Sequence, residues 1–186
     1  MNAHPHADFD AFPSPLSILL FTAALLVYFI PAIVTSRRYS PLSPFRYICW
    51  ALGIVGASLS LIGPLASRAH ADFAAHMAVH LLLGMLSPLL LALAAPVTLL
   101  FRSLRIRHAR KLIRLLKSQP VRWLNDPAVT AIFHIGGLWL LYTTGLYDRM
   151  HHSFVLHALV HLHLFIAGYL FTTSLITIDP APHRTS

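Results

Sequence analysis

The chain has 186 residues, of which 56% are hydrophobic and 11% charged, whereas soluble domains usually contain about 25% charged residues. This composition excludes an ordinary soluble domain and indicates that lipid surrounds most of the surface. The net charge of +8 would suggest a nucleic-acid partner in a soluble protein, but the cations cluster between apolar segments, so membrane topology explains them better and we expect no nucleic-acid partner.

Five apolar segments predict about five transmembrane helices. Each is long enough to cross roughly 30 Å of hydrocarbon at about 1.5 Å per helical residue. Helix is preferred to strand because an isolated span in lipid must satisfy its own backbone hydrogen bonds. We therefore expect an all-α, polytopic membrane helix bundle that forms one domain over residues 1–186, with spans at residues 16–34, 46–65, 77–101, 128–147 and 154–178.

The distribution of cations predicts the orientation. Arg37, Arg38 and Arg46 lie between the first and second spans. Eight more cations follow the third span: Arg102, Arg105, Arg107, Arg110, Lys111, Arg114, Lys117 and Arg122. The opposite connections contain only Arg68 and Arg149. The positive-inside rule therefore predicts an N-terminus outside and a C-terminus in the cytoplasm.

Two local patterns predict departures from straight spans. Gly84, Pro88 and Pro96 predict a bent third span, because proline removes a backbone donor and tends to kink a helix. Residues 103–118 combine cations with apolar residues at spacings of three and four, which is typical of an amphipathic helix on the lipid surface. We expect this segment to lie on the cytoplasmic surface of the lipid, and a partner-docking site is the alternative.

Thirteen histidines in a chain without glutamate indicate metal chemistry. Two pairs have a spacing of four, His76 with His80 and His157 with His161. This spacing stacks side chains on one helical face, which suits two imidazoles that share a metal ion. Both helices run from outside to inside, and His80 and His161 lie roughly 5 and 10 Å below the outer boundary, so the pairs are expected to converge. The alternative is that these are interfacial side chains, although ionisable groups inside a span are costly and usually functional.

The neighbouring residues favour copper over zinc. Imidazole binds zinc, copper, iron and nickel, and a thioether moves the preference toward Cu(I). Met77 lies three residues before His80 and can share its face, although packing is an alternative role. Met85 and His163 are secondary candidates. His134 lies about 20 Å deep and is expected to support the site or to pack beside it.

Two stretches resemble the CtaG-type cytochrome c oxidase assembly factors: HMAVHLLLGMLSPLLLALAAPVTLLF from His76, and GLWLLYTTGLYDRMHHSFVLHALVHLHLFIAGYLF from Gly137. Members of that family resemble one another in three motifs. One helix starts with His-Met-x-x-His-Leu-Leu, the next helix carries a Trp and a Tyr, and a closing helix carries His-x-x-x-His. The similarity covers roughly Tyr47 to Arg184. This sequence departs from the family pattern in two ways. Leu140 stands where many relatives have a histidine, and relatives continue with about two more spans after the matched region.

The resemblance implies a membrane protein of the bacterial inner membrane that helps to mature the copper centres of haem-copper oxidases on the outer face. It points to His76, Met77, His80, His157 and His161 as metal ligands, with His134 and Tyr147 also at matching positions. The implied partners are oxidase subunits and periplasmic copper chaperones, in addition to the lipid bilayer, and a homo-oligomer is left open.

Two other functions are compatible with the histidines. A membrane cytochrome b would use histidines from two helices as haem ligands, but it gains nothing from a second histidine on the same face. A copper transporter would need ligands across the whole bilayer, and the inner half offers only His134 and Cys49. An enzyme is not expected, because we find no phosphate-binding loop, nucleophile motif or intramembrane carboxylate.

Overall fold

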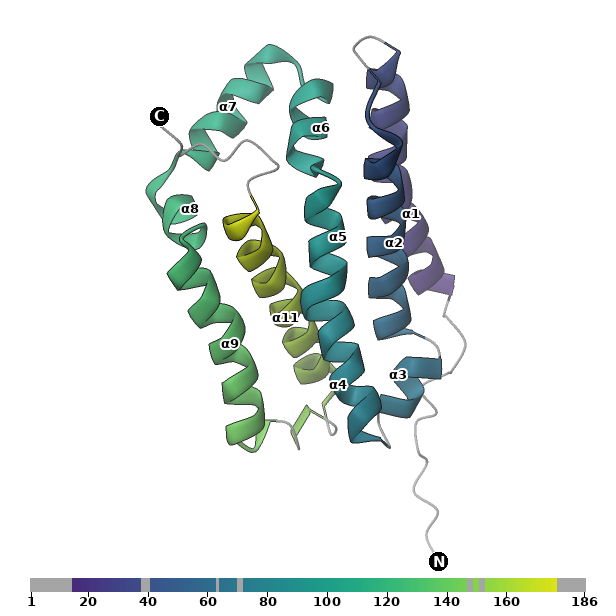
Figure 1. The fold of residues 1–186 in the computed structure, drawn as a ribbon, viewed down its shortest axis with the longest axis vertical. Helices are drawn as coiled ribbons and strands as arrows, with labels where there is room; N and C mark the ends of the chain where they lie inside the picture. Colours follow the sequence, from purple (N-terminus) through teal and green to yellow (C-terminus); the bar gives the residue numbers. More distant parts are fainter. Residues whose placement is uncertain are drawn as a thin grey trace, which may run out of the picture.

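The computed structural model describes residues 15–37, 41–62, 64–69, 72–146, 149–150 and 153–176. In these ranges the chain folds as the predicted all-α helix bundle, in which the long helices alternate in direction (Figure 1). The helices are α1 (Pro15–Ser36), α2 (Pro44–Leu61), α3 (Pro64–Ala69), α4 (Phe73–Leu81), α5 (Ser87–Leu93), α6 (Pro96–Ser103), α7 (Ile106–Leu116), α8 (Gln119–Leu124), α9 (Pro127–Thr143) and α11 (Phe154–Leu175). One π-helical turn, η1 (Leu82–Leu86), joins α4 to α5.

Four helical segments among the described residues are long and apolar enough to cross a membrane: Ser17–Ser36, Pro44–Leu61, Phe73–Leu93 and Val155–Leu175. The fourth predicted span is shorter than expected, because α9 ends at Thr143 and its 17 residues extend only about 25 Å. The second span also ends early, at Leu61, and Pro64 begins the separate helix α3. Proline cannot donate the backbone hydrogen bond that a continuing helix requires.

The predicted bend in the third span occurs at two places. The π-helical turn η1 lies in its middle, and a π-turn accommodates an extra residue that rotates the helical faces on either side. The second break is at Ala95, which has a φ of 53° and precedes Pro96. The Tyr28 hydroxyl of α1 donates a hydrogen bond of 2.7 Å to the carbonyl oxygen of Ala94. This backbone carbonyl next to the break is therefore hydrogen-bonded inside the bundle.

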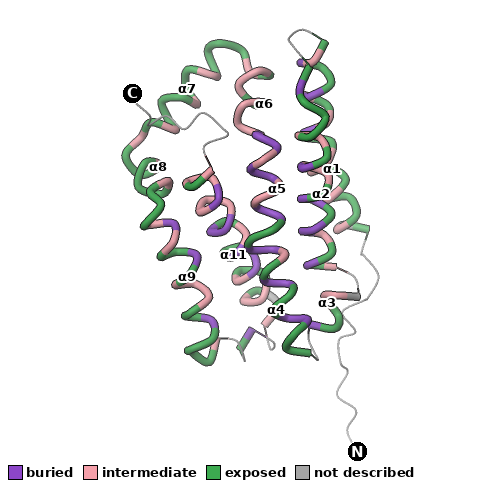
Figure 2. Tube along the Cα trace, viewed as in Figure 1, coloured by how far each residue is buried: buried purple, intermediate pink, exposed green. Residues whose placement is uncertain are grey.

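Close packing of small residues brings the third span against α11. Gly84 of η1 and Gly168 of α11 are both buried. A Cβ added at Gly168 would collide with the carbonyl oxygen of Gly84, and one added at Gly84 would lie 2.9 Å from the Leu164 side chain. Small residues at this crossing let two backbones approach closely, as is common between helices in lipid. Figure 2 shows buried residues along this column and on the faces of α2 and α11 that pack against it.

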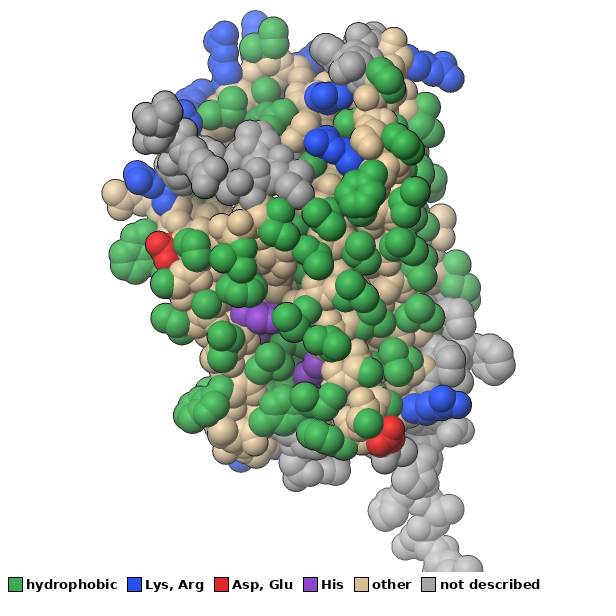
Figure 3. Space-filling view, viewed as in Figure 1, with side chains coloured by type: hydrophobic (Ala, Val, Ile, Leu, Met, Phe, Trp, Pro, Cys, Tyr) green, Lys and Arg blue, Asp and Glu red, His purple; other side chains and the backbone are tan. Residues whose placement is uncertain are grey.

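The two ends of the bundle differ in charge. Lys and Arg side chains gather at the end where α6 and α7 lie, while an apolar surface covers the middle of the view (Figure 3). The C-terminal end of α1 and the N-terminal end of α2 lie at this same end (Figure 1). The two cation-rich connections therefore share one end, as the topology argument requires. Which end faces the cytoplasm stays a prediction.

Candidate metal centre

The first histidine pair lies at the start of the third span, and a side-chain cap determines where its helix begins. The carboxylate of Asp72 accepts hydrogen bonds of 3.1 and 3.2 Å from the backbone N–H groups of Ala74 and Ala75. Such a cap satisfies donors that the first helical turn leaves without partners. His76 and His80 follow on the face of α4 that turns inward, and both are buried, at 3% and 5% exposure.

The second pair lies on α11, which begins behind a similar cap. The Ser153 hydroxyl accepts a hydrogen bond of 3.4 Å from the backbone N–H of Leu156. His157 is half-buried, whereas His161, one turn deeper, is buried at 6% exposure. Both pairs therefore point from their helices toward the interior of the same end of the bundle.

The four imidazoles form a continuous row across the two helices. The ring centres of His76 and His80 are 4.3 Å apart, and those of His157 and His161 are 4.2 Å apart. The row is joined across the helices by His80 and His161, whose ring centres are 5.7 Å apart with an interplanar angle of 83°. The predicted contact between the third and fifth spans is therefore present. Metal binding by these residues stays a prediction.

The hydrogen bond of His161 determines its tautomer. Its Nδ1 lies 2.9 Å from the backbone carbonyl oxygen of His157, and since a carbonyl oxygen can only accept, Nδ1 carries the proton. In the neutral ring the lone pair is then on Nε2. An Nδ1–H donor to a carbonyl is the usual way in which proteins orient a metal-binding histidine.

His80 offers a second ring nitrogen that is suited to bind a metal ion. Its Nε2 is buried without a hydrogen-bond partner among the described residues, an arrangement that costs free energy unless something else binds there. On the other side of the ring, Nδ1 lies 3.4 Å from the Tyr142 hydroxyl of α9. This hydroxyl also donates a hydrogen bond of 3.0 Å to the Met77 sulfur. Tyr142 thus links the methionine and histidine candidates.

The spacing of His80 and His161 fits a shared ion. Two imidazoles bound to one ion by bonds of about 2 Å have ring centres roughly 5 to 6 Å apart, which matches the 5.7 Å observed. However, no group of three or more His, Cys, Asp or Glu side chains in the described ranges is arranged to hold a metal ion. The geometry is therefore that of a two-histidine pair, with one further imidazole beside each member at interplanar angles of 46° and 55°.

Comparison with known proteins shows the family of this chain. A family model described as cytochrome c oxidase caa3 assembly factor matches residues 17–186. The chain belongs to the CtaG family. The resemblance seen in its histidine and tryptophan motifs is thereby confirmed, and the match begins within α1 and includes every later helix described above.

Curated relatives of this CtaG-family chain come from mycobacteria. An uncharacterized protein of Mycobacterium leprae is 29% identical over 90% of the chain, and one of Mycobacterium bovis is 32% identical over 75%. The matched regions are 27% and 22% of those proteins, so the chain spans about a quarter of their length. No solved structure matches the chain.

In this CtaG-family chain the secondary candidates His134 and His163 contact groups other than the four imidazoles. His134 on α9 is buried and stacks on Phe171 of α11, with ring centres 5.7 Å apart, in agreement with the expected packing role. Met85 of η1 is 49% exposed. His163 points from α11 toward α9 instead of α4, because two residues along a helix turn the side chain by about 200°. Tyr147 lies outside the described residues.

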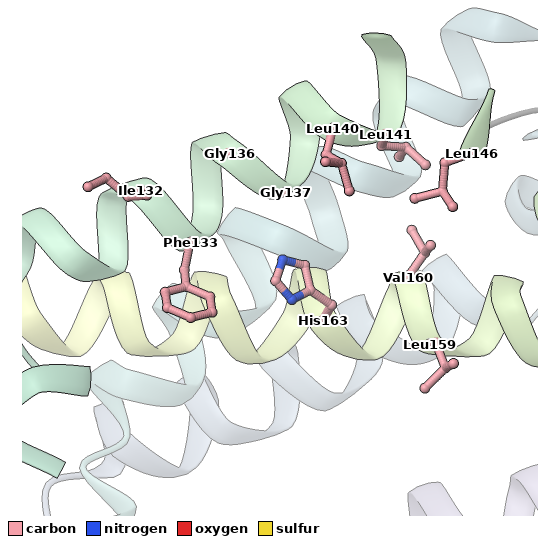
Figure 4. A pocket seen from close by; sticks show the side chains of 10 residues that line it. All are labelled: Ile132, Phe133, Gly136, Gly137, Leu140, Leu141, Leu146, Leu159, Val160 and His163. Carbon is pink, nitrogen blue, oxygen red and sulfur yellow. The ribbon is translucent and has the colours of Figure 1, made fainter. Parts of the chain in front are cut away.

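The ring of His163 lies beside an apolar cavity of about 460 Å³ between α9 and α11 (Figure 4). It sits directly over Gly137, where an added Cβ would collide with Nε2. Apart from this imidazole, the lining consists of aliphatic, phenyl and glycine groups. This cavity is therefore separate from the candidate metal centre, and His163 is the one side chain in its lining that could bind a metal ion.

Sequence reasoning missed Tyr142. Its hydroxyl contacts Met77 and His80 from a third helix, and no spacing within one helix predicts such a contact. The available signal was weak: a polar aromatic residue near the end of an apolar span that carries the tryptophan of the family motif.

Proposed function

We propose that this protein binds copper as Cu(I) between α4 and α11 and delivers it to a haem-copper cytochrome c oxidase during assembly. Copper is here the cargo of the protein, and the role is not enzymatic. The observation that supports the proposal most is the pairing of His80 and His161 across the two helices, with ring centres 5.7 Å apart and a buried His80 Nε2 that no described hydrogen bond satisfies.

The ligand set favours copper over zinc. A structural zinc site almost always has four tetrahedral ligands, whereas the paired histidines and Met77 provide two imidazoles and one thioether. Thioether ligands select Cu(I). The Met77 sulfur and His80 Nδ1 both lie within reach of one hydroxyl, that of Tyr142, so the sulfur is close to the imidazole pair.

The site is suited to releasing an ion as well as binding it. Met77 is 43% exposed while His80 is buried, so one candidate ligand is accessible from outside the pair. His76 and His157 flank the pair at ring distances of 4.3 and 4.2 Å. An ion can therefore move from the buried pair to an outer imidazole in short steps, and we propose this path for exchange with an oxidase subunit or a periplasmic copper chaperone.

A haem-binding role fits the packing less well. The third span and α11 touch at Gly84 and Gly168, one to two turns from His80 and His161. A haem between these histidines would require the two helices to separate. The purified protein is expected to lack a Soret absorption band, and a band with sharp reduced peaks would favour the cytochrome instead.

Metal analysis of variants tests the proposal directly. His80→Ala and His161→Ala should each lose most of the Cu(I) that the wild-type protein binds in detergent, because either change leaves one imidazole of the pair. His108→Ala is the matched control, since His108 is exposed on α7 at the other end of the bundle, and it should bind copper as the wild type does. Full copper binding by folded His80→Ala and His161→Ala proteins would refute the site.

A further inference from the structure

We propose that α7 and α8 form a binding site for the headgroups of anionic phospholipids at the end of the bundle opposite the histidines. The site combines a row of cations, an apolar helical face and an exposed tryptophan. It does not depend on the copper proposal, because it uses different residues at the other end of the molecule (Figure 1).

The cations of α7 lie on one side of the helix. At 100° per residue, Arg107, Arg110, Lys111 and Arg114 fall within an arc of about 100°, and all four are exposed. In the described ranges these cations have no carboxylate nearby in sequence, since the first acidic residue after them is Asp126. Their charge is thus available to phosphate groups, for which arginine is well suited.

The opposite face of α7 is apolar. Ile106, Ala109, Leu112, Ile113 and Leu116 occupy it, and none of them is buried by the rest of the protein. Ile106 is 72% exposed and Ile113 is 40% exposed. A helix with separate apolar and cationic faces lies in the plane of a membrane interface, with its apolar face toward the acyl chains and its cations at the headgroups.

The position of α7 brings it to the membrane surface. The helix follows directly after the third span and α6, and it runs obliquely to the spans instead of alongside them (Figure 1). Figure 2 shows the segment mostly exposed. A segment that connects the end of the third span to the apolar helix α9 is expected to lie at the membrane interface, so lipid is the occupant that the geometry favours over a soluble protein.

The neighbouring helix α8 supplies an independent indication of lipid. Trp123 is 73% exposed and Leu124 is 40% exposed, and α8 contains no buried residue. Tryptophan is enriched at membrane interfaces, because its ring is apolar and its N–H is polar. Arg122 precedes it and is exposed, so the combination of a cation with an apolar anchor recurs on this helix.

Lipid titration followed by native mass spectrometry tests the site on the full chain in a neutral detergent. The wild-type protein should retain dioleoyl phosphatidylglycerol at a concentration several-fold lower than dioleoyl phosphatidylcholine. The variant Arg110→Gln/Arg114→Gln should retain the two lipids at nearly equal concentrations, since each cation near an anionic surface contributes about fivefold to binding. Equal retention of both lipids by the wild type would overturn the proposal.

A matched control removes the same number of charges elsewhere. Arg68 and Arg149 are exposed cations at the other end of the bundle, and the variant Arg68→Gln/Arg149→Gln should keep the wild-type preference. An equal loss in both double variants would show only a general charge effect and would contradict a specific site. Copper stoichiometry should be unchanged in Arg110→Gln/Arg114→Gln, which distinguishes this outcome from failure of the copper proposal.

A third arm separates a lipid headgroup from a simple phosphate site. Excess inorganic phosphate should not displace phosphatidylglycerol from the wild-type protein, because the apolar face of α7 adds acyl-chain contact that phosphate lacks. Complete displacement would mean that the cations bind phosphate alone, and the lipid assignment would be wrong.

Discussion

At the scale of single residues, the hydroxyl of Tyr142 links two candidate ligands. It donates to the Met77 sulfur at 3.0 Å and lies 3.4 Å from His80 Nδ1. A group that holds a ligand from behind affects metal affinity without touching the ion. The backbone oxygen of His157 does the same for His161 on the other helix. Both imidazoles of the central pair are thus oriented through Nδ1.

We therefore expect Tyr142→Phe to weaken Cu(I) binding by about tenfold, within the range typical of outer-shell partners of metal-binding histidines. The aromatic ring remains, so folding should be unaffected. Competition with a Cu(I) chelator measures the change. Tyr47→Phe is the matched control, because the Tyr47 hydroxyl is hydrogen-bonded to that of Ser36 at the end of α1. The Cu(I) affinity of this variant should equal that of the wild type. Unchanged affinity in Tyr142→Phe would remove Tyr142 from the site.

At the scale of helices, the crossing of the third span and α11 decides whether the histidine pairs meet. Gly168 lies against the carbonyl oxygen of Gly84, so the backbones are in direct contact. His80 is four residues before Gly84 and His161 is seven before Gly168. The glycines therefore act as the pivot that determines how close the two imidazoles lie. Gly84 lies within the π-turn, and this turn affects which face of α4 is directed toward α11.

Gly168→Ala should destabilise the bundle by about 1 to 3 kcal/mol, the usual cost of overpacking a close contact. A collision with backbone cannot be relieved by a change of rotamer. Thermal unfolding in detergent measures the effect, and copper binding should weaken in parallel.

Gly136→Ala is the control, because an added Cβ there meets no atom within 4 Å, and alanine favours a helix. Its melting temperature should equal or exceed that of the wild type. Equal stability of Gly168→Ala and Gly136→Ala would show that the close crossing is absent in solution.

At the scale of the whole molecule, most cations of the described residues lie at one end of the bundle. The connection after α6 lies at the same end as the C-terminus of α1 and the N-terminus of α2. The helical starts that carry the histidine pairs lie at the other end (Figure 1). The positive-inside rule then predicts that the candidate metal centre faces outside and that α7 lies in the cytoplasm. The proposed delivery of copper at the outer face requires this orientation.

Cysteine labelling tests this orientation. Cys49 is the free cysteine of the chain and is buried at 2% exposure, so Cys49→Ala provides a background for single cysteines. In intact cells, an impermeant maleimide should label Arg68→Cys. It should label Arg110→Cys only after lysis. The reverse pattern would place the histidines on the cytoplasmic side and contradict delivery at the outer face.

Local patterns in the sequence were sufficient for much of the fold and part of the site. Apolar length predicts the spans, because hydrocarbon thickness sets a minimum number of helical residues. The spacing of four predicts two stacked imidazole pairs, because the geometry of one helix determines it. The amphipathic segment appears as α7, since the periodicity of its apolar residues is also local. Orientation and metal identity stay predictions.

Contacts between helices depended on the tertiary structure. The rotation of α4 depends on the π-turn, the approach of α11 depends on Gly84 and Gly168, and the contact of Tyr142 with Met77 depends on how α9 packs. The last two contacts join residues far apart in the chain, and the relative rotation of their helices results from packing many side chains at once. For this reason the sequence by itself determined which histidines share a helical face and predicted that the two pairs converge, while only the tertiary structure decided that His80 and His161 are the two imidazoles that meet.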